Sequence, residues 1–196
     1  MRVFSLKLSL FFMLLAFSSV SSFAKWTEYF PGGETLCARG EPFSFFVHEG
    51  RTDKIVIDFI GGGACWNSEN CSSEAPTFVD SVNMLKELQK EGLNGIYNHE
   101  HPENPIGDWT HVVVPYCTGD IHWGEKDVTY TDKKGKSFTI HHRGATNAKA
   151  VLAWVEENIL DPKKGLVVTL EDSIFSDTKG GRISSSIDHW SVSKIK

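Results

Sequence analysis

Three short, continuous apolar runs constrain the fold of this chain more than any other feature of its sequence. They are KIVIDFI at 54–60, HVVVP at 111–115 and LVVT at 166–169. Unbroken apolar runs of this length are typical of strands that are buried on both faces of a sheet. Between the last two runs, residues 145–160 predict a helix with one apolar face, made of Ala148, Val151, Leu152, Val155 and Ile159. Strands that alternate with helices predict an α/β layered fold around a mostly parallel sheet.

Weaker patterns add further elements. Residues 43–48 (FSFFVH) predict another strand, which a tight polar turn joins to the strand at 54–60. Apolar residues at near-helical spacing predict a helix over 82–89. The polar stretch 118–135 shows no clear element.

The first 24 residues have the pattern of a secretory signal peptide. Arg2 and Lys7 supply a positive start, residues 8–17 form an apolar run, and small residues at 22 and 24 form a cleavage site. A retained membrane anchor is the alternative, but the apolar run is shorter than the roughly 20 residues that span a bilayer. We therefore expect export and cleavage before Lys25. The mature chain would be secreted or periplasmic, and not bound to a membrane.

Composition limits the class of partner. The 196 residues are 40% hydrophobic and 23% charged, which is typical of one globular domain. The net charge is −5, and removal of the leader with its two basic residues leaves 18 basic against 25 acidic residues, a net charge of −7. No basic cluster remains that would neutralise phosphates, so we expect no nucleic-acid partner.

Four cysteines lie beyond the leader: Cys37, Cys65, Cys71 and Cys117. An even number in an oxidising compartment predicts two disulfides. A zinc site with four thiolates is the alternative, but paired CxxC spacing does not occur. Spacing alone leaves all three connectivities open.

A glycine triplet directly after a predicted strand is the first candidate for chemistry. Residues 61–63 follow the strand at 54–60, and without Cβ atoms their N–H groups can converge on one point. A loop of this kind supplies half of the oxyanion hole in α/β-hydrolases. The alternative is a plain glycine turn.

A second candidate follows the strand at 111–115. Asp120, His122 and Trp123 come shortly after this strand, where enzymes built on sheets place site residues. The alternative is an ordered loop that Cys117 pins.

The adjacent His141 and His142 are a third cluster. Neighbours in a strand point to opposite faces, so a metal ion shared by this pair is not expected. We expect no metal site and no cofactor.

Taken together, these segments resemble one family. They occur in this order: Cys37, GGGACW at 61–66 with Cys71 after it, NPIGDW at 104–109, VPYCTGD at 114–120 with His122 and Trp123, HHRG at 141–144 with Asn147, and AVLAWV at 150–155. The arrangement resembles the pectin acetylesterase family, which includes the Notum carboxylesterases, over residues 34–169.

The resemblance implies an α/β-hydrolase-like fold and a secreted carboxylic-ester hydrolase. Such an enzyme removes acyl groups, as in the deacetylation of carbohydrate esters, with a Ser–Asp–His triad. The resemblance also implies that Cys65 pairs with Cys71 and Cys37 with Cys117. Gly62 and Gly63 would form the oxyanion hole. An acetylated carbohydrate, or another acyl ester, would be the substrate.

The sequence departs from the family at the nucleophile. Family members read roughly VTGxSAG at the strand–turn–helix elbow, whereas this chain continues from LVVT at 166–169 into LEDSIFS. The elbow needs small residues on both sides of the serine, but Ser173 lies between Glu171 and Phe175, so we recognise no catalytic serine. We attribute the adjacent Asp188 and His189 to chance.

We therefore expect three regions. Residues 1–24 are the signal peptide, 25–169 are the N-terminal part of a pectin acetylesterase-like domain, and 170–196 are an atypical serine-rich tail. The α/β fold would then be incomplete, with its C-terminal half missing. A frameshift, a gene-model error and a true short isoform all remain open.

The resulting functional hypothesis is an ester hydrolase by descent whose short chain is inactive. A secreted, non-catalytic glycan-binding module is the first alternative. The rings that could stack on sugars in such a module are those of Trp66, Trp109, Tyr116 and Trp123. The substrate cleft expected for the hydrolase consists of Trp66, Tyr116, Asp120, His122 and Trp123. An unstable translation product is the second alternative, because half a sheet exposes an unpaired strand edge.

Overall fold

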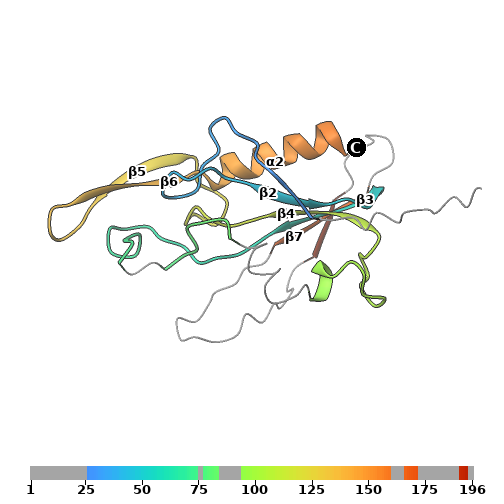
Figure 1. Cartoon of the computed structure of the whole chain (residues 1–196). Coiled ribbons are helices and arrows are strands. Elements are labelled where there is room, and N and C mark those ends of the chain that lie inside the picture. The colour runs from blue at the N-terminus through green and yellow to red at the C-terminus, as the bar shows by residue number, and fades with distance from the viewer. Residues whose placement is uncertain (1–25, 75–76, 84–93, 160–165, 172–189, 194–196) are drawn as a thin grey trace, which may run out of the picture.

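The structure is a computed structural model, and it describes residues 26–74, 77–83, 94–159, 166–171 and 190–193 (Figure 1). Several predicted features lie outside these residues: the signal peptide at 1–24, most of the helix expected at 82–89, and the tail residues Ser173, Asp188 and His189. Among the described residues, no helix has the length and apolar character that crossing a bilayer requires.

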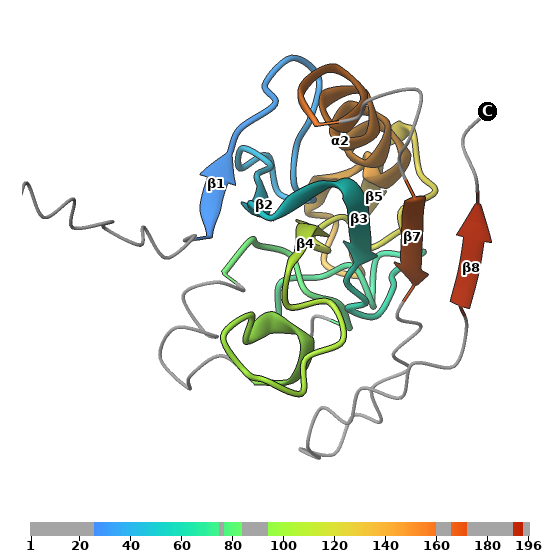
Figure 2. The ribbon, with the colours of Figure 1, turned by 90° about the vertical axis from the view of Figure 1, so that its right-hand side faces the viewer.

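A six-stranded sheet forms the centre of the molecule. Its strands, in spatial order, are β1 (Thr27–Tyr29), β2 (Phe45–His48), β4 (Trp109–Val114), β3 (Arg51–Phe59), β7 (Leu166–Glu171) and β8 (Trp190–Ser193). The four predicted strands therefore form. Figure 2 shows β1 and β8 at opposite edges of this sheet.

The sheet is mixed rather than mostly parallel. Strand β3 runs parallel to both of its neighbours, β4 and β7, whereas the other described pairings in this sheet are antiparallel. Only residues 49–50 connect β2 to β3, and so short a connection forces consecutive strands to run in opposite directions. The expectation of a mostly parallel sheet is thus correct only for the three central strands.

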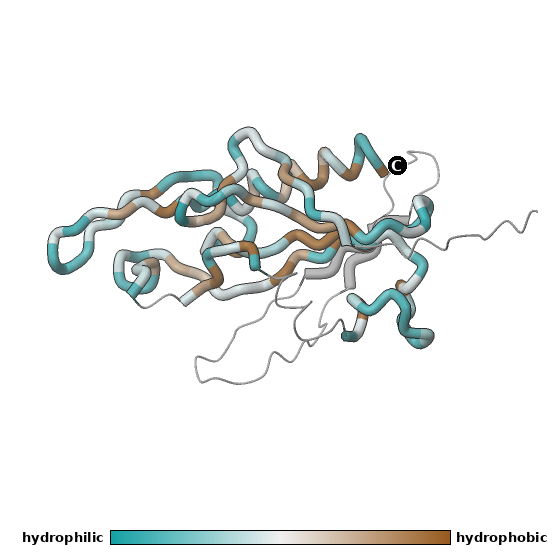
Figure 3. The backbone as a smooth tube through the Cα atoms, viewed as in Figure 1, coloured by the Kyte–Doolittle hydropathy of each residue, from teal (hydrophilic) through white to brown (hydrophobic). Residues whose placement is uncertain are grey.

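Helix α2 (Gly144–Asn158) covers one face of the sheet (Figure 1). Side chains alternate between the faces of a strand, so Ile55 and Ile57 of β3 face α2, where they pack with Val151 and Val155. Tyr29 extends this layer, because its ring packs at a tilt on that of Trp154 with the centroids 4.6 Å apart. Of the apolar stripe predicted over 145–160, Val151 and Val155 are buried and Ile159 packs against the same cluster, whereas Leu152 is 39% exposed. The stripe is therefore correct only in part. Figure 3 colours the helix by hydropathy and shows apolar positions along it.

The opposite face is covered by residues 94–109, here called the η1 segment after its 3₁₀ helix η1 (Gly95–Tyr97). Ile106 packs against Val56 of β3, and Tyr97 packs on the cluster of Trp26 and Phe46. Asn104 holds the segment together, because its amide donates to the carbonyls of Ile96 and Asn98. The sheet is thereby covered on both faces, by a helix and by an ordered loop.

A two-stranded hairpin begins within residues 118–135, which showed no clear element in the sequence, and ends beyond them. It consists of β5 (Lys126–Thr131) and β6 (Ser137–His142), and it extends away from the main sheet (Figure 1). Apolar and polar side chains alternate in both strands: Val128, Tyr130 and Phe138 are half-buried, and the residue that follows each of them is exposed. This two-residue period is typical of a strand with one face in solvent, and the prediction did not use it. Only Ile140 is fully buried, and it packs with Tyr116 and the Cys65–Cys71 disulfide.

Both disulfides form with the pairing that the family resemblance implies. Cys37 is bonded to Cys117, and Cys65 is bonded to Cys71. All four cysteines are buried. The first bridge ties the N-terminal segment to the loop after β4, and the second closes the short turn after the glycine triplet.

Candidate active site

The glycine loop, residues 61–63, begins two residues after β3 ends. Its flanks are fixed by the backbone: Ile60 donates to the carbonyl of Val114, and Cys65 donates to the carbonyl of Gly119. The carbonyl of Gly62 accepts a hydrogen bond from the N–H of Val79. The N–H groups of Gly62 and Gly63 donate to no other described residue. These two backbone donors lie just beyond the carboxyl end of β3, at the edge of the sheet where ligands bind in α/β folds.

Gly62 and Gly63 of this loop do not tolerate a larger residue. A Cβ atom on Gly62 would collide with the ring of Tyr116. Gly63 has a φ of +80°, which favours glycine, and a Cβ atom there would collide with the carbonyl oxygen of Thr77. Close packing from two sides therefore requires both glycines.

Asp120 anchors the neighbouring loop, residues 116–124. Its Oδ1 accepts hydrogen bonds from the Thr118 hydroxyl at 2.6 Å and from the His122 N–H at 3.1 Å. Its Oδ2 accepts from Gly124 N–H at 3.2 Å and from Gly144 N–H at 2.7 Å. Gly144 begins α2, so the carboxylate caps the positive end of that helix. With four donors satisfied, Asp120 fixes the loop and is not placed as a general base.

His122 connects the 116–124 loop to Ile60, which lies between β3 and the glycine loop. Its Nε2 donates to the carbonyl oxygen of Ile60 at 3.0 Å. Its ring also packs edge-on against Phe59 and Tyr116, with centroids 5.3 and 5.1 Å away. The imidazole is therefore a support for the segment that leads into the glycine loop.

The same loop contains two residues in left-handed backbone geometry. Ile121 has a φ of 53° and His122 a φ of 60°, which is rare for residues other than glycine and strained for a β-branched residue. The Tyr116 hydroxyl accepts a hydrogen bond from the N–H of Ile121 at 2.8 Å and helps to hold this geometry. Burial raises the pKa of Tyr116, so its hydroxyl stays neutral.

The tryptophans expected in the cleft point outward. Trp66 is 71% exposed and Trp123 is 83% exposed, whereas Tyr116 is 3% exposed. Backbone bridges join Gly63 to Phe78 and Ala64 to Asp120, so three adjacent segments border the glycine loop. Their exposed apolar side chains form what we call the apolar rim: Trp66, Val79, Ile121 and Trp123.

The sequence drew attention to the two tryptophans of this rim but not to Val79 or Ile121. Val79 directly follows the buried Phe78, and Ile121 stands between Asp120 and His122. Neither belongs to a periodic apolar pattern that would mark it as a surface residue.

Residues of the HHRG motif form an ion-pair network away from this loop. Arg143 holds Asp127 of β5 through two hydrogen bonds of 2.7 Å, and His141 Nδ1 lies 2.9 Å from the same carboxylate. The Arg143 hydrogen bonds lower the pKa of Asp127 to about 2, with a further contribution from His141. His142 points elsewhere, to the carbonyl of Thr118, so the adjacent histidines share no ligand.

One described group has ligand atoms close enough to hold a metal. Atoms of Cys65, Cys71 and His142 lie within 4.8 Å of one another. Both sulfur atoms belong to the disulfide, so in this form they are not thiolate ligands.

Comparison with known proteins identifies the family. The family model described as pectinacetylesterase matches residues 31–169, which is most of the chain. The chain belongs to the pectinacetylesterase family. Similar proteins include palmitoleoyl-protein carboxylesterase notum1a of Danio rerio, 30% identical over 97 residues, and NOTUM of Homo sapiens, 29% identical over 92 residues.

These matches cover only part of each protein. They include 47% and 45% of this chain but 19% and 18% of the two relatives, so the chain spans about a fifth of their length. Among solved structures, the Wnt deacylase Notum from Drosophila is similar over 70% of this chain and 39% of its own. The TM-score is 0.46 and the sequence identity 19%.

Within this pectinacetylesterase-family chain, the strand expected before a nucleophile does form. β7 extends two residues further than the apolar run at 166–169, and its last residue, Glu171, is aligned with Phe59 of β3. The parallel pairing means that the chain leaves β7 beside the segment that leads into the glycine loop. Ser173 itself lies outside the described residues.

Proposed function

We propose that this chain carries the oxyanion-stabilising part of a carboxylic-ester hydrolase. The observation that supports this most directly is the pair of N–H groups on Gly62 and Gly63, on a loop where packing requires glycine. During ester cleavage a nucleophile attacks the carbonyl carbon, and negative charge develops on the carbonyl oxygen. Donors fixed about 2.7–3.1 Å from that oxygen lower the barrier, because they need no reorganisation.

We further propose an acetyl ester on a carbohydrate as the substrate of the complete site. Membership of the pectinacetylesterase family supports the reaction class. The apolar rim supports the carbohydrate, because Trp66 and Trp123 expose flat rings that can pack on sugar faces. The relatives named above are palmitoleoyl-protein carboxylesterases, which also cleave acyl esters. An α/β-hydrolase-like arrangement of the whole domain belongs to the same proposal.

We infer that the chain is exported. Its two buried disulfides fit an oxidising compartment, and the N-terminal pattern fits a cleaved leader. Sequencing the N-terminus of the expressed, mature protein should give Lys25 as the first residue. A chain that starts at Met1 in the cytosol would contradict this inference.

We propose that the 196-residue chain does not by itself hydrolyse esters. Acyl transfer needs a nucleophile and a base next to the oxyanion donors, and Ser173 lies between residues too large for a nucleophile elbow. Hydrolysis of p-nitrophenyl acetate should be equal for the wild type and the Ser173→Ala variant. Clear activity that is lost in Ser173→Ala, together with labelling of Ser173 by a fluorophosphonate, would show that the tail forms a working elbow.

Binding without catalysis is the second candidate function, and the exposed rings of the rim favour it. Acetylated pectin oligosaccharides should bind the wild type more tightly than the Trp66→Ala, Trp123→Ala double variant. Phe30→Ala is the matched control, because Phe30 is also an exposed aromatic residue, at 63%, and lies outside the rim. Equal binding by all three proteins would remove the carbohydrate part of the proposal.

A further inference from the structure

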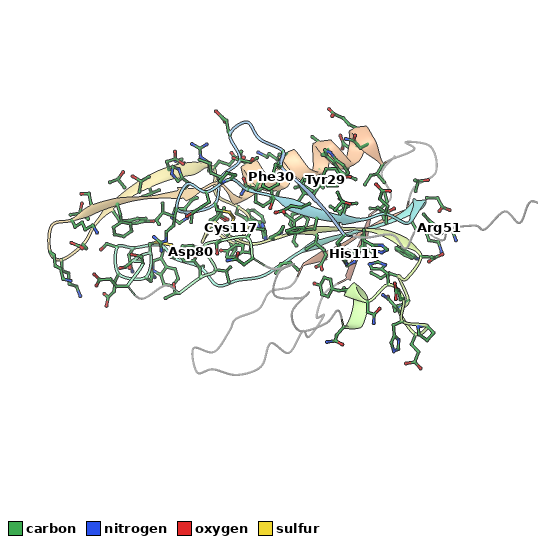
Figure 4. The ribbon with its side chains drawn as sticks, in the orientation of Figure 1. Tyr29, Phe30, Arg51, Asp80, His111 and Cys117 are labelled. Atoms are coloured by element: carbon green, nitrogen blue, oxygen red, sulfur yellow. A yellow bond between two sulfur atoms is a disulfide. The ribbon has the colours of Figure 1, made fainter. Side chains whose placement is uncertain are left out.

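A buried cluster of ionisable side chains lies on the face of the sheet opposite α2, and the proposed ester hydrolysis does not use it. His111 of β4 is fully buried, Asp58 of β3 is 3% exposed and His48 of β2 is 9% exposed. The η1 segment adds Tyr97 and His99 from the other side. Figure 4 shows His111 on the side of the sheet that faces this segment.

These side chains form one continuous line of polar contacts. His99 Nδ1 lies 3.2 Å from the carbonyl oxygen of Gly107, and His99 Nε2 lies 3.2 Å from His111 Nδ1. On the far side of the ring, His111 Nε2 lies 3.6 Å from Asp58 Oδ2. The Tyr97 hydroxyl donates to the same carboxylate oxygen at 2.7 Å. The line therefore starts and ends in the η1 segment and passes through two strands of the sheet.

The positions of most protons in this line follow from what each atom can do. A carbonyl oxygen only accepts, so His99 Nδ1 carries a proton and donates it to Gly107. A neutral His99 then has an unprotonated Nε2, which must accept, and His111 Nδ1 must be the donor. A neutral His111 would have its second nitrogen, Nε2, without a proton.

A neutral His111 would place two hydrogen-bond acceptors, its Nε2 and the Asp58 carboxylate, opposite one another inside the protein. The lone pair of Nε2 would point toward the Asp58 carboxylate, with His111 fully buried and Nε2 without a hydrogen-bond partner among the described residues. A buried polar atom without a partner costs about 1–3 kcal/mol, and such atoms call for an explanation. One additional proton between Nε2 and Asp58 removes the conflict.

The proton cannot be placed on His99 instead at neutral pH. Burial is the main cause that lowers the pKa of His99 to about 4, and the neighbouring His48 and His111 lower it further. His99 and His48 stack with ring centroids only 3.8 Å apart, so a charge on His99 would lie against a second imidazole. His111 is the remaining base in the line, and imidazole is a stronger base than carboxylate.

We propose that His111 and Asp58 form a buried proton-binding site, with His111 protonated on both nitrogens, and that this proton holds the η1 segment onto the sheet. The titratable groups that face His111 are Asp58 from β3, and Tyr97 and His99 from the η1 segment. His48 of β2 faces His99. The ring of Trp26 covers the cluster 5.1 Å from His111. Asp58 contacts Tyr97 and His111 contacts His99, so the pair makes both of these polar contacts between the sheet and the η1 segment. Loss of its proton should therefore weaken the docking of the segment.

The proposal predicts how docking of the η1 segment depends on pH. Loss of the shared proton at high pH would leave an acceptor facing the carboxylate. Uptake of a further proton by His99 at low pH would place a second charge beside His48 and His111, and would remove the acceptor that His111 Nδ1 needs. Docking of the η1 segment should therefore be weaker at both extremes of pH than near neutrality.

Nuclear magnetic resonance of the full chain, with ¹⁵N-labelled histidine, tests the proposal at pH 7. We expect directly bonded protons on both ring nitrogens of His111 in the wild type. In Asp58→Asn the amide can itself donate to Nε2, so the Nε2 proton of His111 should disappear. A wild-type Nε2 without a proton, or an Nε2 proton that persists unchanged in Asp58→Asn, would overturn the proposal.

Hydrogen exchange provides the second readout and covers the case in which Asp58→Asn fails to fold. Tyr97→Phe removes one attachment to Asp58 but keeps the ring. Amides of residues 97–109 should exchange several-fold faster in this variant than in the wild type, while amides of α2 should not change. Protection of these amides in the wild type should also fall on either side of neutral pH. A flat pH profile, or equal acceleration in α2, would contradict the link between the proton and the segment. These measurements do not depend on esterase activity.

Discussion

Replacing Asp120 by Asn should destabilise the fold strongly although the two side chains have the same shape. The amide keeps one oxygen, so two of the four donors that now bind Asp120 would face an N–H group instead of an acceptor. The Gly144 N–H belongs to the first turn of α2. The substitution therefore acts on the loop and on the helix together.

The expected cost follows from these contacts. Each donor left without its acceptor costs about 1–3 kcal/mol, although the Thr118 hydroxyl can rotate away. Loss of the charge at the start of α2 adds about 0.5–1 kcal/mol. The sum is about 3 kcal/mol, which corresponds to a fall in Tm of roughly 10 °C for a chain of this size.

Thermal unfolding followed by circular dichroism measures this cost. Asp108→Asn is a matched control, because the Asp108 side chain is 62% exposed and makes one long ion pair of 3.4 Å with Arg51; its expected cost is below about 0.5 kcal/mol. Amides in the first turn of α2 should also exchange faster in Asp120→Asn only. If Asp120→Asn and the control have the same Tm, Asp120 does not anchor the loop and the helix as we describe.

Three further predictions concern the disulfides and two titrating groups. Replacing both cysteines by serine should cost more stability for the Cys37–Cys117 bridge, which spans 80 residues, than for Cys65–Cys71, which spans six; urea denaturation should show about 4.5 against about 2 kcal/mol from loop closure, and equal losses would contradict the ranking. Because the pKa of Asp127 is lowered to about 2, its ion pair stabilises the fold above about pH 4 and is lost as the pH falls toward 2, so Asp127→Asn should flatten the pH dependence of Tm in this range. Because the pKa of His99 is lowered to about 4, the folded state binds fewer protons than the unfolded state, and the fold loses stability as the pH falls from about 6.5 to 4. His99→Phe should reduce the fall in Tm over this range. A pH dependence of Tm that is the same in wild type and variant would count against a buried neutral His99.

The strands of this fold could be predicted because their signal is local. The runs at 54–60, 111–115 and 166–169 form β3, β4 and β7 within a few residues of the predicted limits, since strands buried on both faces need continuous apolar sequence. The hairpin at 126–142 was missed because exposure removes that requirement. The strand order was also beyond prediction, because nothing in the sequence near β2 and β3 indicates that β4 lies between them.

In the candidate site, too, features with a local sequence signal were predictable and features that depend on distant contacts were not. The glycine loop was predictable from three glycines after a strand, and the 116–124 loop from polar residues after the next strand. The family resemblance, rather than spacing, supplied the disulfide pairing. The role of Asp120 as the cap of α2 was not predictable, because its partner Gly144 lies 24 residues further along the chain. Contacts of this kind depend on tertiary structure and leave no local pattern.

The position of β3 has a consequence for the order of folding. Its two neighbours, β4 and β7, come later in the chain, at residues 109–114 and 166–171. A growing chain that has reached β3 therefore has neither of the strands that will pair with it, and β2, which comes next to it in sequence, pairs instead with β4. Native pairings between such distant segments close slowly, because a long loop must be ordered first. The central strand cannot complete its pairing before residues 166–171 have been made, so we expect this sheet to assemble only after that point rather than from β1 onward.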